Sequence, residues 1–326
     1  MPGRCQTPLR FAPLFRRYLW GGRRLADRLG KPLGPGNDYA ESWEIVDRPD
    51  DQSVVQFGPL RGLALGELVR QHGSDLLGRH APQPRFPLLM KILDCQRTLS
   101  VQVHPNDRQA ALLQPPDLGK TEAWVVLDAE PESRIYAGLR PGMTAAALRA
   151  ALAAGDCDAC LHQFAPQPGD CLFIPAGVVH ALGAGLLIAE IQQASDATFR
   201  LFDFNRVDAQ GRSRPLHVEQ ALAVIDFARG PVAPQRPTPT ELPWRETLVA
   251  CDKFLLHRCR ADRPVARGCE DRCTLVTVLE GTVGIEGDPA DRPLAAGETA
   301  LVPAAAGQLV VHPRAASVWL ESSLPD

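Results

Sequence analysis

The sequence predicts a mainly β protein in which one β unit occurs twice and helical segments are inserted or link the two copies. Short stretches that are apolar, or that alternate apolar and polar residues, dominate the chain and are separated by turn residues, which is typical of strands. A short pattern also recurs: residues 169–175 (GDCLFIP) and 297–303 (GETALVP) each comprise a glycine, an acidic residue, four mostly apolar residues and a proline. Because each copy follows two strand-like stretches joined by a turn, this weak repeat indicates a duplicated β unit.

Several strand-like stretches precede the second copy of the repeat. In chain order they are SWEIVD (42–47), SVVQFG (53–58), PLLMKIL (87–93), TLSVQVH (98–104), EAWVVLDA (122–129), SRIYAGL (133–139), DCLFIPAG (170–177) and LLIAEIQQ (186–193). In the fourth stretch, Val101 and Val103 alternate with Ser100, Gln102 and His104. At period two, the three polar side chains point to one face of the strand. Three polar residues on one face of an apparently buried strand suggest a functional site.

Three stretches have the apolar spacing and the end signals of helices. They are expected over residues 63–73 (ending at Gly73), 144–155 (from Thr144 to Gly155) and 213–230 (from Ser213 to Gly230). Thr144 and Ser213 are candidate caps, because a hydroxyl oxygen accepts a hydrogen bond from the first turn. The glycines supply the backbone conformation in which helices commonly end.

These patterns divide the chain into two domains and a connector. The N-terminal domain is expected over residues 1–230, with helical segments at about 140–163 and 213–230. Residues 231–245 are rich in proline, which predicts an extended linker. Residues 246–326 then form the smaller C-terminal domain.

The composition is that of an ordinary soluble protein. The 326 residues are 45% hydrophobic and 22% charged, and the formal net charge of −3 gives no reason to expect nucleic-acid binding. No apolar run approaches the ~20 residues of a membrane helix, and the first residues lack the apolar core of a secretory signal. We therefore expect a cytoplasmic protein that binds neither nucleic acid nor membranes. Its nine cysteines are expected to be reduced, including Cys157 and Cys160, which have no second pair at zinc-finger spacing.

The first copy of the repeat continues into a histidine. Residues 169–180 read G-x5-P-x-G-x-x-H and end at His180. This pattern resembles the second sequence motif of cupins, which are small antiparallel barrels of the jelly-roll kind. In such a barrel a strand runs into a Pro-Gly turn, and the next strand begins with a histidine that points inward. The resemblance therefore implies two cupin barrels with a helical segment between or within them.

A metal site follows if residues 99–104 form a neighbouring strand of the first barrel. Gln102 and His104 would then point inward toward His180, and Glu122 would begin the next strand. Two imidazoles, a carboxylate and an amide oxygen suit Zn²⁺, and Mn²⁺, Fe²⁺ or Co²⁺ are conceivable. The alternative is that both histidines are hydrogen-bonded barrel residues without a metal. The second barrel lacks such a set, and its His312, which precedes a proline, is expected to lie at a strand end.

Longer stretches resemble the type I mannose-6-phosphate isomerase family in its short bacterial form. They are PLLMKILDCQRTLSVQVHPND (87–107), GKTEAW (119–124), GDCLFIPAGVVHALGAGLLIAEIQQASDATFRLFDFNR (169–206) and, more briefly, WGG (20–22) and ESWEI (41–45). The likeness is dense from about residue 88 to residue 206 and thinner elsewhere. It implies an isomerase that interconverts mannose 6-phosphate and fructose 6-phosphate through a cis-enediol(ate), with the catalytic site in the N-terminal domain and one zinc ion per chain.

The resemblance also assigns residues to roles. It places the zinc ligands at Gln102, His104, Glu122 and His180, an active-site arginine at Arg200, substrate-side residues at Ser100 and Lys120, and acidic residues near the reaction centre at Glu190 and Asp196. Arg200 and Lys120 would supply positive charge for the substrate. The general base stays open between Glu190 and Asp196, either of which has the alternative role of an ion-pair partner for Arg200 or Lys120.

Two other classes of protein use similar residues. A metal-dependent cupin oxygenase or oxidase would also bind its metal with histidine and glutamate, but it usually offers a His-x-His pair where this chain has Gln102 and His104. A non-catalytic protein that binds a sugar phosphate would keep the fold without turnover, although every matched site residue is present here. The partner expected in the isomerase reading is a sugar-phosphate substrate, and the oligomeric state stays open.

Overall fold

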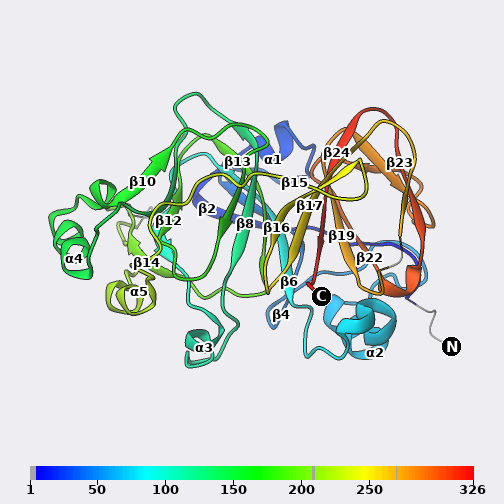
Figure 1. Cartoon of the computed structure of the whole chain (residues 1–326), viewed down its shortest axis with the longest axis horizontal. Coiled ribbons are helices and arrows are strands. Elements are labelled where there is room, and N and C mark those ends of the chain that lie inside the picture. The colour runs from blue at the N-terminus through cyan, green and yellow to red at the C-terminus, as the bar shows by residue number, and fades with distance from the viewer. Residues whose placement is uncertain (1–4, 208–209, 269) are drawn as a thin grey trace.

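The structure, a computed structural model, describes residues 5–207, 210–268 and 270–326. The expectation of a mainly β protein is confirmed, and the sheets form two halves that lie side by side (Figure 1). Among the described residues, none of the helices has both the length and the apolar character of a membrane span.

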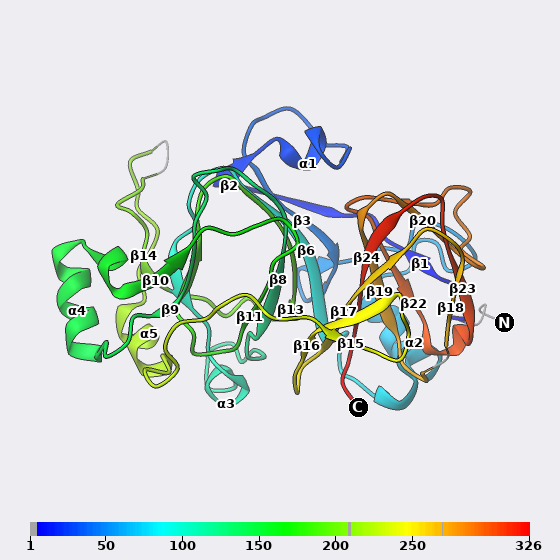
Figure 2. The same cartoon turned by 45° about the horizontal axis from the view of Figure 1, so that its top comes forward.

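The first half contains two antiparallel sheets that face each other (Figure 2). One is a six-stranded sheet with the order β11 (Cys171–Ile174), β8 (Glu122–Ala129), β13 (Leu186–Gln193), β6 (Leu88–Cys95), β3 (Tyr39–Ile45) and β2 (Leu14–Gly22). The other is a five-stranded sheet with the order β10 (Leu161–Phe164), β9 (Ile135–Leu139), β12 (His180–Leu182), β7 (Val101–Val103) and β14 (Phe199–Phe202). Trp124 of β8 and Ile135 of β9 belong to one buried cluster, so the inner faces of the two sheets share a core.

The second half also pairs two antiparallel sheets. The larger is seven-stranded, with the order β1 (Leu9–Arg10), β22 (Thr299–Val302), β19 (Thr274–Glu280), β24 (Ser317–Ser323), β17 (Leu255–Ala261), β16 (Arg245–Ala250) and β15 (Thr238–Pro239). The smaller is four-stranded, with the order β18 (Val265–Arg267), β23 (Leu309–Pro313), β20 (Thr282–Ile285) and β21 (Leu294–Ala295). Trp319 of β24, fully buried, packs among apolar residues from both sheets.

The helix expected from Thr144 to Gly155 is confirmed as α4 (Ala145–Ala154). The Thr144 hydroxyl accepts a hydrogen bond from the Ala147 N–H at 3.2 Å, which satisfies a donor of the first turn. Gly155 ends the helix with a φ of 74°, a conformation that glycine adopts without steric cost. A short 3₁₀ turn, Cys157–Cys160, follows, and residues 161–163 of the expected helical segment belong instead to strand β10.

The other two expected helices have different ends. Helix α2 (Leu65–Leu77) is kinked at His72, whose φ of −129° and ψ of 25° are not helical, and a second helical stretch follows in which Leu76 and Leu77 are buried in the core. It ends at Gly78, which has a φ of 60°. The expected end at Gly73 thus matches a break in the helix at the neighbouring His72, although α2 as a whole extends to Leu77.

Helix α5 (Val218–Val224) is shorter than the expected helix over 213–230. Ser213 is not its cap, since it forms an isolated β-bridge with Val207. The chain before the helix runs along β14 instead: the His217 N–H donates to the Arg200 carbonyl at 2.7 Å, and the Arg200 guanidinium donates to the Pro215 carbonyl at 2.9 Å. These long-range bonds hold residues 213–217 in a non-helical path.

The remaining elements are short. They are α1 (Arg24–Asp27), α3 (Asp107–Ala110), the 3₁₀ turns Gly78–His80 and Ala304–Ala306, and the two-stranded sheet of β4 (Asp47–Arg48) and β5 (Asp51–Gln52). The expected strand over residues 53–58 makes only isolated bridges, from Val54 to Ala64 and from Val55 to Phe11.

Segments from the beginning of the chain complete the second half. Strand β1 pairs with β22, with Leu9 opposite Leu301. Helix α2 lies beneath the second half (Figure 1), and its Leu76 and Leu77 share a buried cluster with Leu275 of β19. Burial of this common apolar surface holds the two halves together.

A buried ion pair stabilises the segment that follows α1. The Lys31 ammonium donates to Glu44 Oε1 at 2.6 Å, and the Ser42 hydroxyl donates to the same oxygen at 2.5 Å. The two charged residues are only 6% and 5% exposed. Lys31→Met is expected to lower the free energy of unfolding by about 3–5 kcal/mol, because it leaves the Glu44 carboxylate buried without a counter-charge. Urea denaturation of the purified variant measures this loss.

The matched control for this prediction is Arg28→Gln. Arg28 pairs with Asp128 at 3.4 Å, but its side chain is 65% exposed. Water screens such a pair, so we expect its loss to cost at most about 1 kcal/mol. Equal effects of the two substitutions would contradict the argument from burial.

Candidate active site

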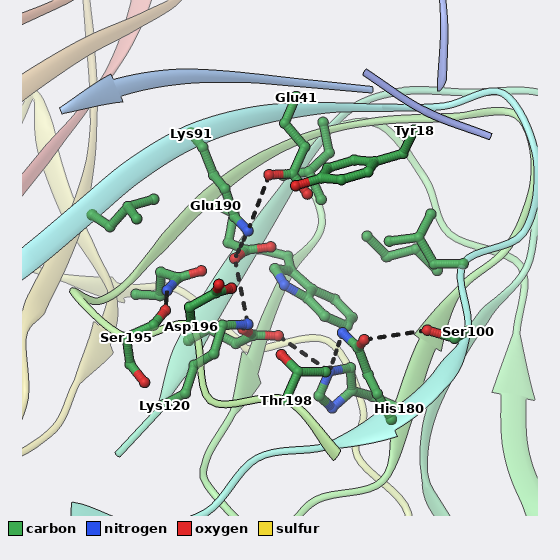
Figure 3. A pocket seen from close by; sticks show the side chains of 18 of the residues that line it. Tyr18, Glu41, Lys91, Ser100, Lys120, His180, Glu190, Ser195, Asp196 and Thr198 are labelled. Carbon is green, nitrogen blue, oxygen red and sulfur yellow. Dashed lines mark hydrogen bonds and ion pairs between the residues drawn. The ribbon is translucent and has the colours of Figure 1, made fainter. Parts of the chain in front are cut away.

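A pocket of about 320 Å³ opens between the six-stranded and five-stranded sheets of the first half (Figure 3). Eight strands contribute to its lining: β2, β3, β6, β7, β8, β12, β13 and β14. Every predicted site residue lines this pocket except His104, which contacts two lining residues, Lys120 and Glu122. The pocket therefore brings together residues that are far apart in the sequence.

Two histidines and a glutamate converge at the floor of the pocket. His104 follows β7, Glu122 begins β8 and His180 begins β12. His104 Nε2 lies 3.5 Å from Glu122 Oε2, and His180 Nε2 lies 3.3 Å from Glu122 Oε1. The ligand atoms of the three residues all lie within 4.8 Å of one another, and all three side chains are buried. Among the described residues, this is the one cluster of histidine, cysteine and carboxylate groups with that spacing.

The backbone fixes which nitrogen of each imidazole faces the cluster. His104 Nδ1 lies 2.9 Å from the Ala197 carbonyl oxygen, and His180 Nδ1 lies 2.9 Å from the Val178 carbonyl oxygen. Each Nδ1 is therefore the protonated donor, and each Nε2 keeps its lone pair for a cation. A histidine that donates its other nitrogen to a carbonyl is the usual arrangement at a metal.

Gln102 lies beside the cluster, as strand alternation predicts. It pairs with His180 across β7 and β12, and its Nε2 lies 3.3 Å from His180 Nε2. Its Oε1 accepts a hydrogen bond from the Ser100 hydroxyl at 3.5 Å. Rotation of the amide by 180° about its last bond exchanges the oxygen and the nitrogen and turns an oxygen toward the histidines.

A positively charged side chain, that of Lys120, lies at this site. The Lys120 ammonium lies 2.9 Å from His104 Nε2 and also donates to Glu122 Oε2. His104 Nε2 and the Glu122 carboxylate bind this positive group, and His180 Nε2 lies next to the same carboxylate, so the set of donors fits a divalent metal ion. Burial, and then the Lys120 charge, lower the pKa of His104 well below its ordinary value and that of His180 to about 3. Both imidazoles are thus neutral at pH 7, the form that binds metals.

Above this cluster, a buried lysine lies between two carboxylates (Figure 3). Lys91 Nζ lies 3.1 Å from Glu190 Oε1 and 3.7 Å from Glu41 Oε2, and Lys120 Nζ lies 4.0 Å from Glu190 Oε1. The register of the sheet creates this contact, because Glu190 of β13 pairs directly with Lys91 of β6. Burial, and then the Glu122 charge, raise the pKa of Glu190, while the two lysines oppose the rise.

Lys91 and Glu41 were not predicted as site residues. The signal for Lys91 was its place in PLLMKIL, a strand that is otherwise entirely apolar. A lysine is almost never fully buried unless it is paired, so its position implied buried carboxylate partners. Glu41 gave no comparable signal, since ESWEI contains two glutamates and only the register distinguishes them.

The remaining predicted residues, Asp196, Ser100 and Arg200, also line the pocket. Asp196 is exposed, and its N–H donates to Asp117 at 3.1 Å. Ser100 is buried and accepts a hydrogen bond from Arg200 Nε at 3.3 Å. Arg214 also lines the pocket, although no sequence signal singled it out.

Cys157 and Cys160 lie outside this pocket, in the 3₁₀ turn after α4, and both are buried. Burial raises the pKa of Cys157 to about 12, so the thiol is protonated at neutral pH. All eight cysteines of the described residues are free thiols, and Cys269 lies outside the described residues.

Comparisons with known proteins place the chain among sugar-phosphate isomerases. A family model described as phosphomannose isomerase type I, catalytic domain, matches residues 9–132. The chain is 37% identical to mannose-6-phosphate isomerase ManA of Bacillus subtilis, over 84% of this chain and 86% of that protein. It is 38% identical to mannose-6-phosphate isomerase of Streptococcus mutans, over 86% of this chain and 88% of that protein. The crystal structure of mannose 6-phosphate isomerase from Bacillus subtilis superposes with a TM-score of 0.89 at 28% identity, covering 97% of this chain and 99% of that one.

Proposed function

The chain belongs to the type I phosphomannose isomerase family, and on that premise we propose that it interconverts mannose 6-phosphate and fructose 6-phosphate. The observation that carries this proposal is the pocket in which a His-Glu-His cluster lies next to buried lysine–carboxylate pairs. An aldose–ketose isomerisation needs this combination: a cation site to hold the sugar oxygens, and a carboxylate to carry a proton between adjacent carbons.

We propose one Zn²⁺ per chain, held by Gln102, His104, Glu122 and His180. The proposal is supported by the two Nε2 atoms that face the cluster, the Glu122 carboxylate between them and the Lys120 ammonium beside His104 and Glu122. Nitrogen and oxygen ligands suit zinc, and zinc can expand from four to five ligands, which would admit a substrate oxygen beside the four protein ligands. When bound, the ion would act as a Lewis acid toward the sugar oxygens.

The proton transfer is assigned to Glu190. The reaction moves a proton between C2 and C1 of the sugar through a cis-enediol(ate), so the base must reach both carbons. Glu190 is only 3% exposed and its pKa is raised, which brings it nearer to the pH at which a carboxylate both takes and returns a proton efficiently. Asp196, the alternative base, lines the same pocket but is exposed.

Positive groups lie beside Glu190, where negative charge would develop on the sugar oxygens during the reaction. Lys91 and Lys120 both lie within 4.0 Å of its Oε1 and would stabilise negative charge on the enediolate oxygens. Ser100, Lys120 and Arg200 are proposed to bind the substrate, since each presents a hydrogen-bond donor at the pocket. The proximity of these donors to the proposed metal site would orient the sugar.

For the fold we propose two jelly-roll barrels of the cupin type. The facing sheets of each half, the antiparallel pairing and the single His-Glu-His cluster within the described residues support this. We retain the division into a catalytic domain over residues 1–230, a linker over 231–245 and a C-terminal domain over 246–326. On this division β1 is a strand contributed by the first domain to the second.

A coupled assay of fructose 6-phosphate formation tests the proposed function. Purified protein loaded with Zn²⁺ is expected to turn over mannose 6-phosphate, to lose activity on chelation and to regain it when Zn²⁺ is returned. No turnover by the zinc-loaded protein would contradict the proposal. Activity that survives complete chelation would contradict the metal dependence alone, and activity that only Fe²⁺ restores would contradict the choice of zinc.

A further inference from the structure

The active-site pocket has one side where lysines and carboxylates are mixed and another side where the charged lining residues are arginines. Glu190 and Asp196 lie with Lys120 on one side, and Ser100 lies on the other (Figure 3). Arg200 lies with Ser100, because its Nε donates to the Ser100 hydroxyl at 3.3 Å, and Arg214, the other arginine of the lining, precedes Pro215, whose carbonyl accepts from Arg200. A dianionic phosphate group is attracted more strongly by the second side, because the lysines of the first side are already paired with carboxylates.

Arg214 is positioned by a buried carboxylate. Its Nε donates to Asp203 Oδ2 at 2.8 Å and its Nη2 donates to Asp203 Oδ1 at 2.5 Å. Asp203 is 6% exposed and also accepts a hydrogen bond from Arg206. Although burial raises the pKa of Asp203, the hydrogen bonds from Arg214 and Arg206 lower it below its ordinary value. The carboxylate therefore stays ionised and orients the Arg214 guanidinium.

Both guanidinium groups keep donors for a ligand. Arg214 uses Nε and Nη2 on Asp203, and Arg200 uses Nε on Ser100 and Nη1 on the Pro215 carbonyl. Nη1 of Arg214 and Nη2 of Arg200 donate to no residue that the structure describes. The Pro215 contact also ties the two arginines together, since Pro215 follows Arg214 in the chain.

Arg206 provides a contrast with Arg214. It bonds to the same carboxylate of Asp203, but its Nη1 donates to the Thr98 carbonyl and it does not line the pocket. Of the two arginines that share Asp203, only Arg214 faces the space that a substrate would fill. Arg206 links Asp203 to the backbone at Thr98, whereas the Arg214 guanidinium faces the pocket.

We propose that Arg214, held by Asp203, binds the phosphate group of the substrate together with Arg200 and Ser100, and thereby makes the enzyme selective for phosphorylated hexoses. This rests on the proposed function. Two guanidinium groups and a hydroxyl match the geometry and charge of a phosphate monoester, because planar N–H donors suit its oxygens. Asp203 is a positioning residue that acts through Arg214. Neither residue takes part in the proton transfer, so their contribution is to binding.

Arg214→Gln tests this proposal. We expect the KM for mannose 6-phosphate and the Kd of inorganic phosphate, measured by calorimetry, each to rise about ten- to a hundredfold, as for the loss of one charge-assisted hydrogen bond. Binding of mannitol, a probe without a phosphate group, is expected to stay unchanged. Arg214→Lys should restore part of the phosphate affinity, since it returns the charge without the planar fork.

Arg206→Gln is the matched control, because it removes a partner of Asp203 without removing an arginine of the pocket. Three results would overturn the proposal: an unchanged phosphate Kd in Arg214→Gln, an equal loss of mannitol affinity, or an equal loss of phosphate affinity in Arg206→Gln. If Arg214→Gln does not fold, Arg214→Lys gives the same comparison. Absence of turnover by the wild-type enzyme would instead contradict the proposed function, since phosphate binding is measured without it.

Discussion

His104→Ala is expected to abolish turnover of mannose 6-phosphate and binding of the metal together. The substitution removes one of the two Nε2 atoms that face Glu122 and leaves a cluster with one imidazole. A bound metal contributes several kcal/mol to stabilising the transition state, and each 1.36 kcal/mol is a factor of ten in rate. We therefore expect kcat/KM to fall by at least about a thousandfold. Elemental analysis of the dialysed protein should show that zinc falls from one ion per chain to nearly none.

The control for this experiment is His312→Ala in the second half. His312 lies in β23, is exposed and belongs to no cluster of candidate ligands among the described residues. Both its activity and its zinc content should equal those of the wild type. If His104→Ala keeps its zinc and its turnover, the metal is held elsewhere, and the assignment of the ligands is wrong.

Glu190→Gln should lower kcat by about 10²–10⁴-fold, the usual contribution of a positioned general base. The amide has nearly the same shape as the carboxylate but takes no proton from C2. The matched substitution Asp196→Asn should change kcat by less than about tenfold. Asp196 is exposed, and it lies outside the lysine–carboxylate cluster that Lys91 forms with Glu41 and Glu190. Initial rates at saturating substrate measure both variants.

Two further measurements separate catalysis from structure in these variants. Zinc content should be unchanged in both, because within the described residues no hydrogen bond or ion pair joins Glu190 or Asp196 to a proposed zinc ligand. The KM of Glu190→Gln should change less than its kcat, which indicates an interaction that matters in the transition state. If kcat falls strongly in Asp196→Asn and stays normal in Glu190→Gln, then Asp196 is the general base and Glu190 is not.

Much of this site was predictable because strand geometry is local. Period-two alternation places Gln102 and His104 on one face of a strand from the sequence alone, and the Pro-Gly turn before His180 marks the start of another strand. The structure brings both histidines together with Glu122 and places Gln102 beside His180. The cap at Thr144 and the stop at Gly155 were predictable for the same reason, since each depends on only a few neighbouring residues.

The lysine–carboxylate cluster was only partly predictable. Its members come from three strands, and which carboxylate lies beside Lys91 depends on register: a shift of β13 by one residue would turn Glu190 to the opposite face. Arg214 was missed for a similar reason. Its place at the pocket depends on the long-range bonds to Asp203 and on the path of residues 213–217 along β14.

The sequence by itself determined the mainly β class, the metal-ligand pattern and the resemblance to a family, because these depend on local alternation and on short motifs. Only the tertiary structure decided that α2 continues to Leu77, that β1 completes a sheet of the second half, and that Arg214 faces the pocket. Each of these depends on contacts between residues far apart in the chain. Their free energy comes from burying surface and pairing charges that a local pattern does not specify, so the folded arrangement alone reveals them.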